Sequence, residues 1–113
     1  MRFMTDWRLR FLKNRFLSML GISKKAGKLV LGFDPAAEEM QKGKVVLLIL
    51  SDDLSPKTAA KIEKTAQDNK VKAIKAKCSM DEISWSIGKR TGILAVTDTG
   101  LAKSLEKLAE QID

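Results

Sequence analysis

The sequence contains no histidine and a single cysteine, Cys78, among its 113 residues. Without histidine the chain lacks the commonest general base and the commonest metal ligand. One cysteine alone forms neither an intramolecular disulfide nor a zinc site, and a lone thiol is typical of a reducing compartment. No Gly-x-Gly-x-x-Gly or phosphate-loop motif is present. These absences predict a protein that is not an enzyme and needs no cofactor or metal.

Long apolar runs are also missing. The longest, Val45–Leu50, has six residues, whereas about 20 are needed to span a bilayer. Charges interrupt the apolar residues at the N-terminus and no small-residue cleavage motif follows, so we expect no secretory signal. The sequence therefore predicts a cytoplasmic protein.

The positive charge is unevenly distributed. The net charge is +7, and residues 1–33 carry all of it, with eight basic residues against one acid, Asp6. The eight are Arg2, Arg8, Arg10, Lys13, Arg15, Lys24, Lys25 and Lys28. The other 80 residues hold 13 basic and 13 acidic groups. A basic lobe beside a neutral body favours a polyanionic partner, namely RNA, DNA or an anionic membrane.

Apolar periodicity and end signals predict five helices alternating with four strands in one domain. The expected strands cover residues 29–31, 45–50, 71–75 and 93–96. The expected helices run over residues 7–25, from an Asp34 N-cap to Gly43, from Ser55-Pro56, from a Ser79–Glu82 capping box to Gly88, and from Thr97 or Asp98. Six consecutive apolar residues at 45–50 are expected where helices cover both faces of a strand. We therefore expect an α/β fold with a central, mostly parallel or mixed, four-stranded sheet covered on both faces.

Two basic segments are candidates for binding. Lys24, Lys25 and Lys28 cluster at a helix end and strand start, shortly before the predicted helix N-terminus at Gly32-Phe33-Asp34. Lysines and exposed helix N-terminal amides both bind phosphate, although lysines at a helix end also offset its dipole. The second segment is the glycine-flanked loop Lys89-Arg90-Thr91, which suits a bulged nucleotide or a phosphate, or is a solvated connection. Convergence of both loops on one sheet edge would favour binding.

Aromatic residues and one acidic pair leave alternatives open. Phe33 either stacks on a base or plugs the core, and the plug is favoured. Trp85 lies between inward-facing positions of its helix, so we expect it to point outward, toward a partner or a neighbouring loop. Asp52 and Asp53 follow the central strand, where they form either a magnesium site or, the favoured interpretation, a solvated turn. Trp7 and the N-terminal arginines would also suit a membrane surface.

Four segments resemble one known family. MLGISKKAGKLVLG (residues 19–32) and KGKVVLLILSDD (42–53) resemble the L7Ae and L30e type of ribosomal protein. The closing IGKR (87–90) and ILAVTDTG (93–100) look most like its bacterial YlxQ branch. The resemblance covers about residues 14–108. Residues 1–13 are then a basic N-terminal extension, and residues 14–113 are the domain.

The resemblance implies a three-layer α/β/α sandwich with a four-stranded mixed sheet. It also implies a non-catalytic protein, associated with the ribosome, that binds kink-turn or related bulged RNA. The RNA surface would comprise the start of the second helix, the end of the central strand and the loop before the last strand. The residues expected there are Lys24, Lys25 and Lys28 on phosphates, Gly32 permitting close approach, Phe33 and Asp34 at the base edge, and Lys89, Arg90 and Thr91 closing over the RNA.

The sequence departs from the family pattern at the second helix. Archaeal kink-turn binders carry Gly-x-Asn-Glu-x-x-Lys, where this chain has Gly32-Phe33-Asp34-Pro35-Ala36-Ala37-Glu38. Asp34 accepts hydrogen bonds but does not donate as asparagine does. Pro35 lacks a backbone donor, and Glu38 is negative where a lysine would meet phosphate. These changes leave the fold and general RNA binding expected and weaken the expectation of kink-turn specificity.

Two other functions remain open. The first is a protein-interaction adaptor on the same fold, in which Trp85 and the acidic Glu38-Glu39 pair would matter. The second is a detached substrate-binding domain, like those fused to ribose methyltransferases, acting in trans. For the oligomeric state, a monomer is favoured.

Overall fold

The computed structural model describes the backbone of residues 2–112 and the side chains of residues 7–112. It confirms the predicted alternation of helices and strands. The helices are α1 (Arg2–Lys25), α2 (Phe33–Gln41), α3 (Pro56–Asp68), α4 (Met80–Ile87) and α5 (Thr99–Ile112). The strands are β1 (Leu29–Leu31), β2 (Leu47–Leu50), β3 (Lys72–Lys75) and β4 (Ile93–Val96).

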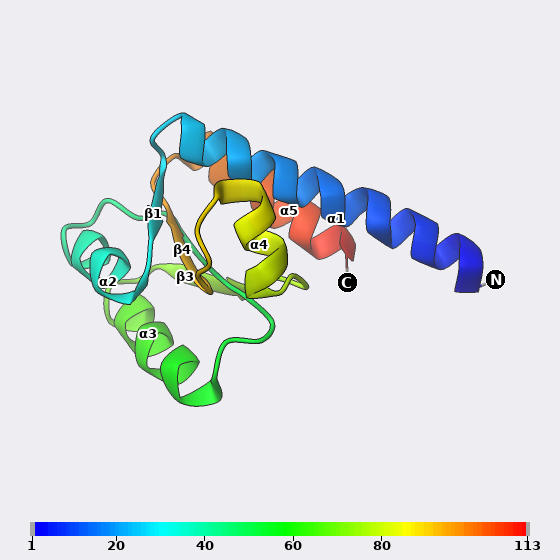
Figure 1. The fold of residues 1–113 in the computed structure, drawn as a ribbon. Helices are drawn as coiled ribbons and strands as arrows, with labels where there is room; N and C mark the ends of the chain where they lie inside the picture. Colours follow the sequence, from blue (N-terminus) through cyan, green and yellow to red (C-terminus); the bar gives the residue numbers. More distant parts are fainter. Residues whose placement is uncertain (1, 113) are drawn as a thin grey trace.

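The four strands form one mixed sheet in the order β1-β4-β2-β3. β4 runs antiparallel to both β1 and β2, whereas β2 and β3 are parallel. α1, α4 and α5 cover one face of the sheet, and α2 and α3 cover the other (Figure 1). The fold is therefore the α/β/α sandwich with a four-stranded mixed sheet that the sequence predicts.

The central strand β2 shows why its sequence is continuously apolar. Leu47 and Ile49 pack into the core cluster under α1, α4 and α5, while Leu48 and Leu50 pack into the cluster under α2 and α3. Successive side chains of a strand point to opposite faces. Because helices cover both faces here, all four side chains are buried.

α1 begins at Arg2, five residues before the predicted start, and ends at Lys25 as predicted. Phe16 and Leu20, one helical turn apart, are fully buried against the sheet. Gly27, at φ 73°, ends the helix, with the Lys28 amide donating to Ser23 O and the Gly27 amide donating to Lys24 O. These two bonds form a Schellman motif, which fixes where the chain leaves α1.

Three predicted details are wrong. The N-cap of α2 is Gly32, not Asp34, because Gly32 adopts φ 97° and ψ 163° and the chain enters the helix at Phe33. Val45 and Val46 do not belong to β2, and the Val46 side chain is 41% exposed. The neighbouring strand β4 ends at Val96, opposite Leu47. The Val46 amide still donates to Val96 O at 2.9 Å, but no residue of β4 lies opposite Val45 or Val46. The third strand also begins one residue late, at Lys72.

The other end signals are confirmed. The Ser55 hydroxyl accepts from Thr58 N at the start of α3, and Gly88, at φ 77°, ends α4. Asp98 caps α5, because its carboxylate accepts the Leu101 amide at 2.8 Å. Within residues 2–112, no helix combines the length and apolar character needed to cross a membrane.

Candidate functional site

Three segments that are distant in the sequence meet at one end of the sheet. The Gly32 amide donates to Ile93 O at 3.0 Å, and the Ser51 amide donates to Gly92 O at 3.0 Å. The start of α2, the end of β2 and the end of the loop before β4 therefore lie together. This is the grouping that the family resemblance implies, and we call Gly32–Asp34 with Lys89–Gly92 the β1/β4 edge.

Glycine is required at two positions of this edge. Gly32 has a positive φ of 97°, which side-chain-bearing residues rarely adopt. At Gly92 an added Cβ would lie 2.5 Å from Ser51 Oγ. Ser51 itself is fully buried, and its hydroxyl has no hydrogen-bond partner among the described residues. The backbone at this edge is thus closely packed and its conformation is tightly constrained.

The three lysines lie at the opposite end of β1. Lys28 O accepts the Thr97 amide at 3.0 Å, just beyond the end of β4. The three residues of β1 lie between Lys28 and Gly32, so four residue steps separate these two by about 13 Å. Lys24, Lys25 and Lys28 are exposed and make no ion pair with any other described residue. The structure therefore does not place them beside Gly32.

The loop after α4 connects the two ends. Ile87, just before this loop, lines the same groove as Lys24 and Lys25, whereas Ile93, just after it, binds Gly32. Figure 1 shows the loop descending from the end of α4, beside α1, to the start of β4, roughly alongside β1. The predicted residues thus form a strip along one side of the molecule, not a single cluster.

Within this loop, two of the three predicted residues have internal partners. Arg90 Nε donates to Asp81 Oδ1 at 2.8 Å, and this hydrogen bond and the charge of Asp81 raise the pKa of Arg90. The Thr91 hydroxyl accepts the Ile93 amide at 3.2 Å and so shapes the loop. Lys89 is exposed and forms no ion pair within the described part of the chain. Lys89 is therefore the loop cation that stands free for a ligand.

At the start of α2, Phe33 is partly buried against the core beneath α2 and α3, as the core-plug interpretation predicts. Asp34 is exposed in the first helical turn, where the helix dipole stabilises a negative charge. Glu38, which stands where the family pattern has lysine, pairs with Lys42 at 3.2 Å, and Lys42 also contacts Glu39 at 3.5 Å. The hydrogen bond with Glu38 raises the pKa of Lys42. α2 therefore balances part of this negative charge internally.

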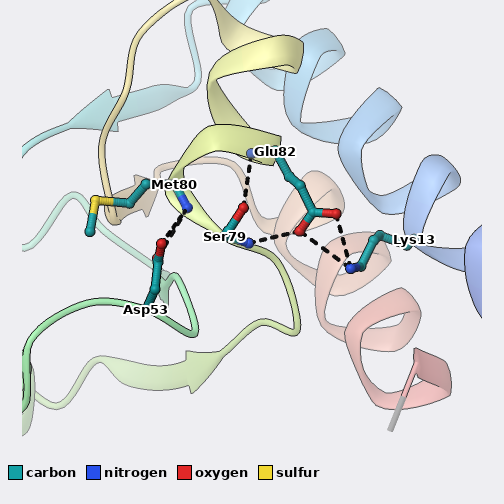
Figure 2. A network of polar contacts seen from close by, with 5 residues as sticks. All are labelled: Lys13, Asp53, Ser79, Met80 and Glu82. Atoms are coloured by element: carbon teal, nitrogen blue, oxygen red, sulfur yellow. Dashed lines mark hydrogen bonds and ion pairs between the residues drawn. The ribbon is translucent and has the colours of Figure 1, made fainter.

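A polar network holds α4, and with it the loop (Figure 2). Ser79 and Glu82 form the predicted capping box, and Glu82 also binds Lys13 Nζ of α1 at 3.1 Å. Burial acts to raise the pKa of Glu82, but the Ser79 hydrogen bonds and Lys13 outweigh it, so that pKa lies below its ordinary value. From the other side, Asp53 accepts the Met80 amide at 3.1 Å.

The contact between Asp53 and Met80 bears on the magnesium alternative. Both candidate carboxylates are exposed, and one of them, Asp53, is engaged at the N-terminus of α4. Among the described residues, no three His, Cys, Asp or Glu side chains gather in a way that would hold a metal ion. Asp53 has a structural role, and the turn it occupies leads into the Ser55 cap.

One surface feature was not predicted from the sequence. Trp85, 77% exposed as its helical position predicts, lies on a groove of about 800 Å³ between α1 and α4. Ile22, 55% exposed, lines the same groove from α1. Only the crossing of the two helices brings these side chains together.

Comparison with known proteins places the chain in a family. The model of the Ribosomal protein L7Ae/L30e/S12e/Gadd45 family matches residues 14–106. The chain is 33% identical over 93 residues to the RNA-binding protein YlxQ of Bacillus subtilis, covering 81% of this chain and 92% of that protein. It is 24% identical over 98 residues to the RNA-binding protein YlxQ of Enterococcus faecium, covering 87% of this chain and 94% of that one.

Solved structures agree. A protein of unknown function from Bacillus halodurans superimposes with a TM-score of 0.77 at 26% identity, covering 84% of this chain and 96% of that one. The Giardia lamblia 15.5kD RNA binding protein has a TM-score of 0.70 at 14% identity, covering 89% and 87%, which is a likeness of fold alone. The sequence match extends over most of the chain, and the fold agrees with it. The chain belongs to the Ribosomal protein L7Ae/L30e/S12e/Gadd45 family.

Proposed function

We propose that this protein is a non-catalytic RNA-binding protein that recognises structured RNA through the β1/β4 edge. The observation that carries the proposal is the joining of Gly32 to Ile93 and Ser51 to Gly92, which sets the start of α2 beside a basic loop. The YlxQ relatives, named RNA-binding proteins, support the same class of partner. We place the protein in the cytoplasm, in association with the ribosome.

The residues have different roles in this proposal. Gly32 has no side chain and lets RNA approach the backbone, and Asp34 accepts hydrogen bonds from a base edge. Lys89 contacts phosphate from the loop. Arg90 donates from Nε to Asp81 and from Nη1 to Met80 Sδ, and Nη2 contacts RNA. Lys24, Lys25 and Lys28, about one short strand away, contact phosphates farther along the RNA and add affinity more than specificity.

The RNA that suits this edge is kink-turn-like or bulged. An unpaired, splayed nucleotide exposes the base edges that Asp34 can read, whereas a regular A-form helix does not. The Glu38–Lys42 pair reduces the repulsion that Glu38 alone would exert on a phosphate. Residues 1–13, which precede the family match, act as a basic extension that adds electrostatic affinity.

The test is a titration against a kink-turn RNA and an equally long plain duplex at two salt concentrations. We expect tighter binding to the kink-turn RNA, with a log–log salt slope of roughly −0.7 to −0.9 per phosphate contacted. Replacing Lys25 and Lys28 with glutamine should flatten that slope by about 1.4 to 1.8. The matched control replaces Lys57 and Lys61, exposed on α3, and should change the slope little.

Three outcomes would contradict the proposal. Equal affinity for both RNAs would leave non-specific binding only. An unchanged slope and affinity in the Lys25 and Lys28 variant would remove these lysines from the binding surface. Binding to neither RNA would favour the protein-adaptor function instead.

A further inference from the structure

The groove between α1 and α4 lies outside the β1/β4 edge and has an unusual lining. Trp85 and Ile22, two of the largest exposed apolar side chains, face it from opposite helices. Asn14 and Ser18 add polar atoms along α1. The ring of Trp85 is 77% exposed, so one of its faces is available to a flat ligand.

The charge of the groove is positive. Lys24 and Lys25 line it and make no ion pair with any other described residue. Glu82 is the acid among the lining residues, and its carboxylate is already engaged by Lys13 and by the Ser79 amide. The groove therefore presents two free cations beside an exposed indole, which complements an anionic partner with flat apolar groups.

The groove is also continuous with the proposed RNA surface. Ile87 lines the groove and leads directly into the loop that carries Lys89. Lys25, on the other wall, precedes the turn into β1, which ends at Leu31, directly before Gly32. A nucleotide strand that extends from RNA bound at the β1/β4 edge can therefore reach the groove along either of these two segments.

The outer face of α1 extends the groove. Trp7, Phe11, Asn14, Ser18 and Ile22 follow one another in steps of three or four residues and so share one side of the helix. The rings of Trp7 and Phe11 lie 6.2 Å apart, nearly parallel, and both are more than half exposed. Aromatic groups therefore continue along α1 beyond the groove.

We propose that the α1–α4 groove binds unpaired nucleotides that flank the structured RNA, with one base stacked on Trp85 and phosphates held by Lys24 and Lys25. This inference rests on the proposed function for the identity of the flanked RNA. Exposed aromatic side chains in a cationic groove are how proteins hold single strands, because every base has a face to stack. A duplex does not offer such a base.

The experiment compares a blunt kink-turn RNA with the same RNA carrying six unpaired uridines at its 5′ or its 3′ end. The full chain should bind one tailed RNA at least about fivefold more tightly than the blunt one. Trp85→Leu should weaken tailed binding roughly 5- to 150-fold and leave blunt binding unchanged, whereas Trp85→Phe, which keeps a ring, should retain most of the gain. Val46→Ala, at an exposed apolar site away from the groove, is the control.

Two results would overturn the inference: no gain from either tail, or an equal loss of tailed and blunt binding in Trp85→Leu. A second measurement separates it from the proposed function. In Trp7→Phe, where Trp85 is the remaining tryptophan, free hexauridylate should quench the fluorescence, and less so as salt rises. Quenching without blunt RNA binding would refute the proposed function alone, and absence of quenching would refute the groove.

Discussion

Replacing Gly92 with alanine places a methyl group at a crowded point of the β1/β4 edge. The added Cβ would lie 2.5 Å from Ser51 Oγ, 3.1 Å from Leu54 Cδ1 and 3.3 Å from Met80 Cγ. The first distance is too short to be tolerated without movement. Overpacking of this kind costs about 1–3 kcal/mol. We expect Gly92→Ala to lower the free energy of unfolding by that amount.

The Ser51 hydroxyl makes the prediction specific. It is buried and has no hydrogen-bond partner among the described residues, so its removal gives up no protein hydrogen bond. Ser51→Ala alone should therefore be neutral or stabilise by up to about 1 kcal/mol. In the double variant, Ser51→Ala removes the closest clash that Gly92→Ala creates. The double variant should therefore recover about 1 kcal/mol or more of the stability that Gly92→Ala alone loses, measured as a coupling energy.

The assay is urea unfolding of the four proteins of this cycle, followed by far-UV circular dichroism. Gly43→Ala is the matched control, because Gly43 has φ 75° but its added methyl meets nothing within 4 Å. Gly43→Ala should lower the free energy of unfolding through backbone strain, and adding Ser51→Ala should not change that loss. A Gly92→Ala protein as stable as the parent, or one that Ser51→Ala does not rescue, would refute the packing argument.

Three further predictions concern single residues. Gly32→Ala should cost about 1–3 kcal/mol in urea unfolding, because φ 97° with ψ 163° is a region that essentially only glycine adopts, and an unchanged stability would contradict the assigned backbone. The pKa of Glu82 is lower in the folded than in the unfolded protein. The ionised carboxylate therefore contributes fully to the free energy of unfolding above the unfolded-state pKa of about 4.3, and this contribution is lost as pH falls through the folded-state pKa. Glu82→Gln, which keeps the capping hydrogen bond, should lower the free energy of unfolding by about 0.2–1 kcal/mol at pH 7. It should also make that free energy less dependent on pH below about pH 4.3. The same pH dependence as in the parent protein would contradict the ion pair with Lys13. Burial raises the pKa of Cys78 to about 12, so at pH 8 Ellman's reagent should react with it only after unfolding, and rapid reaction of the native protein would show that the thiol is accessible.

Elements whose signals are local were predictable from the sequence. Phe16 and Leu20 recur at helical spacing, and Ser79 and Glu82 satisfy each other's backbone donors within one turn. Neither feature depends on the rest of the chain. The exposure of Val46 was not predictable, because it depends on where the neighbouring strand ends, and a run of apolar letters does not contain that information.

The candidate site was predictable in its segments and not in its arrangement. The basic turn, the start of α2 and the loop before β4 were identified from glycine and charge, but the separation of Lys28 from Gly32 follows from the pairing of β1 with β4. The engagement of Arg90 by Asp81 across α4 likewise needs the fold. The Trp85 groove escaped prediction because its two walls, α1 and α4, are more than 50 residues apart in sequence.

Chemical-shift mapping tests the central claim most directly. Uniformly ¹⁵N-labelled protein would be titrated with a kink-turn RNA while the backbone amide resonances are followed. The amides of Gly32, Phe33, Asp34, Lys89 and Thr91 should shift most. Shifts confined to α3 and α5, with these five amides unmoved at saturation, would contradict the claim that structured RNA binds at the β1/β4 edge.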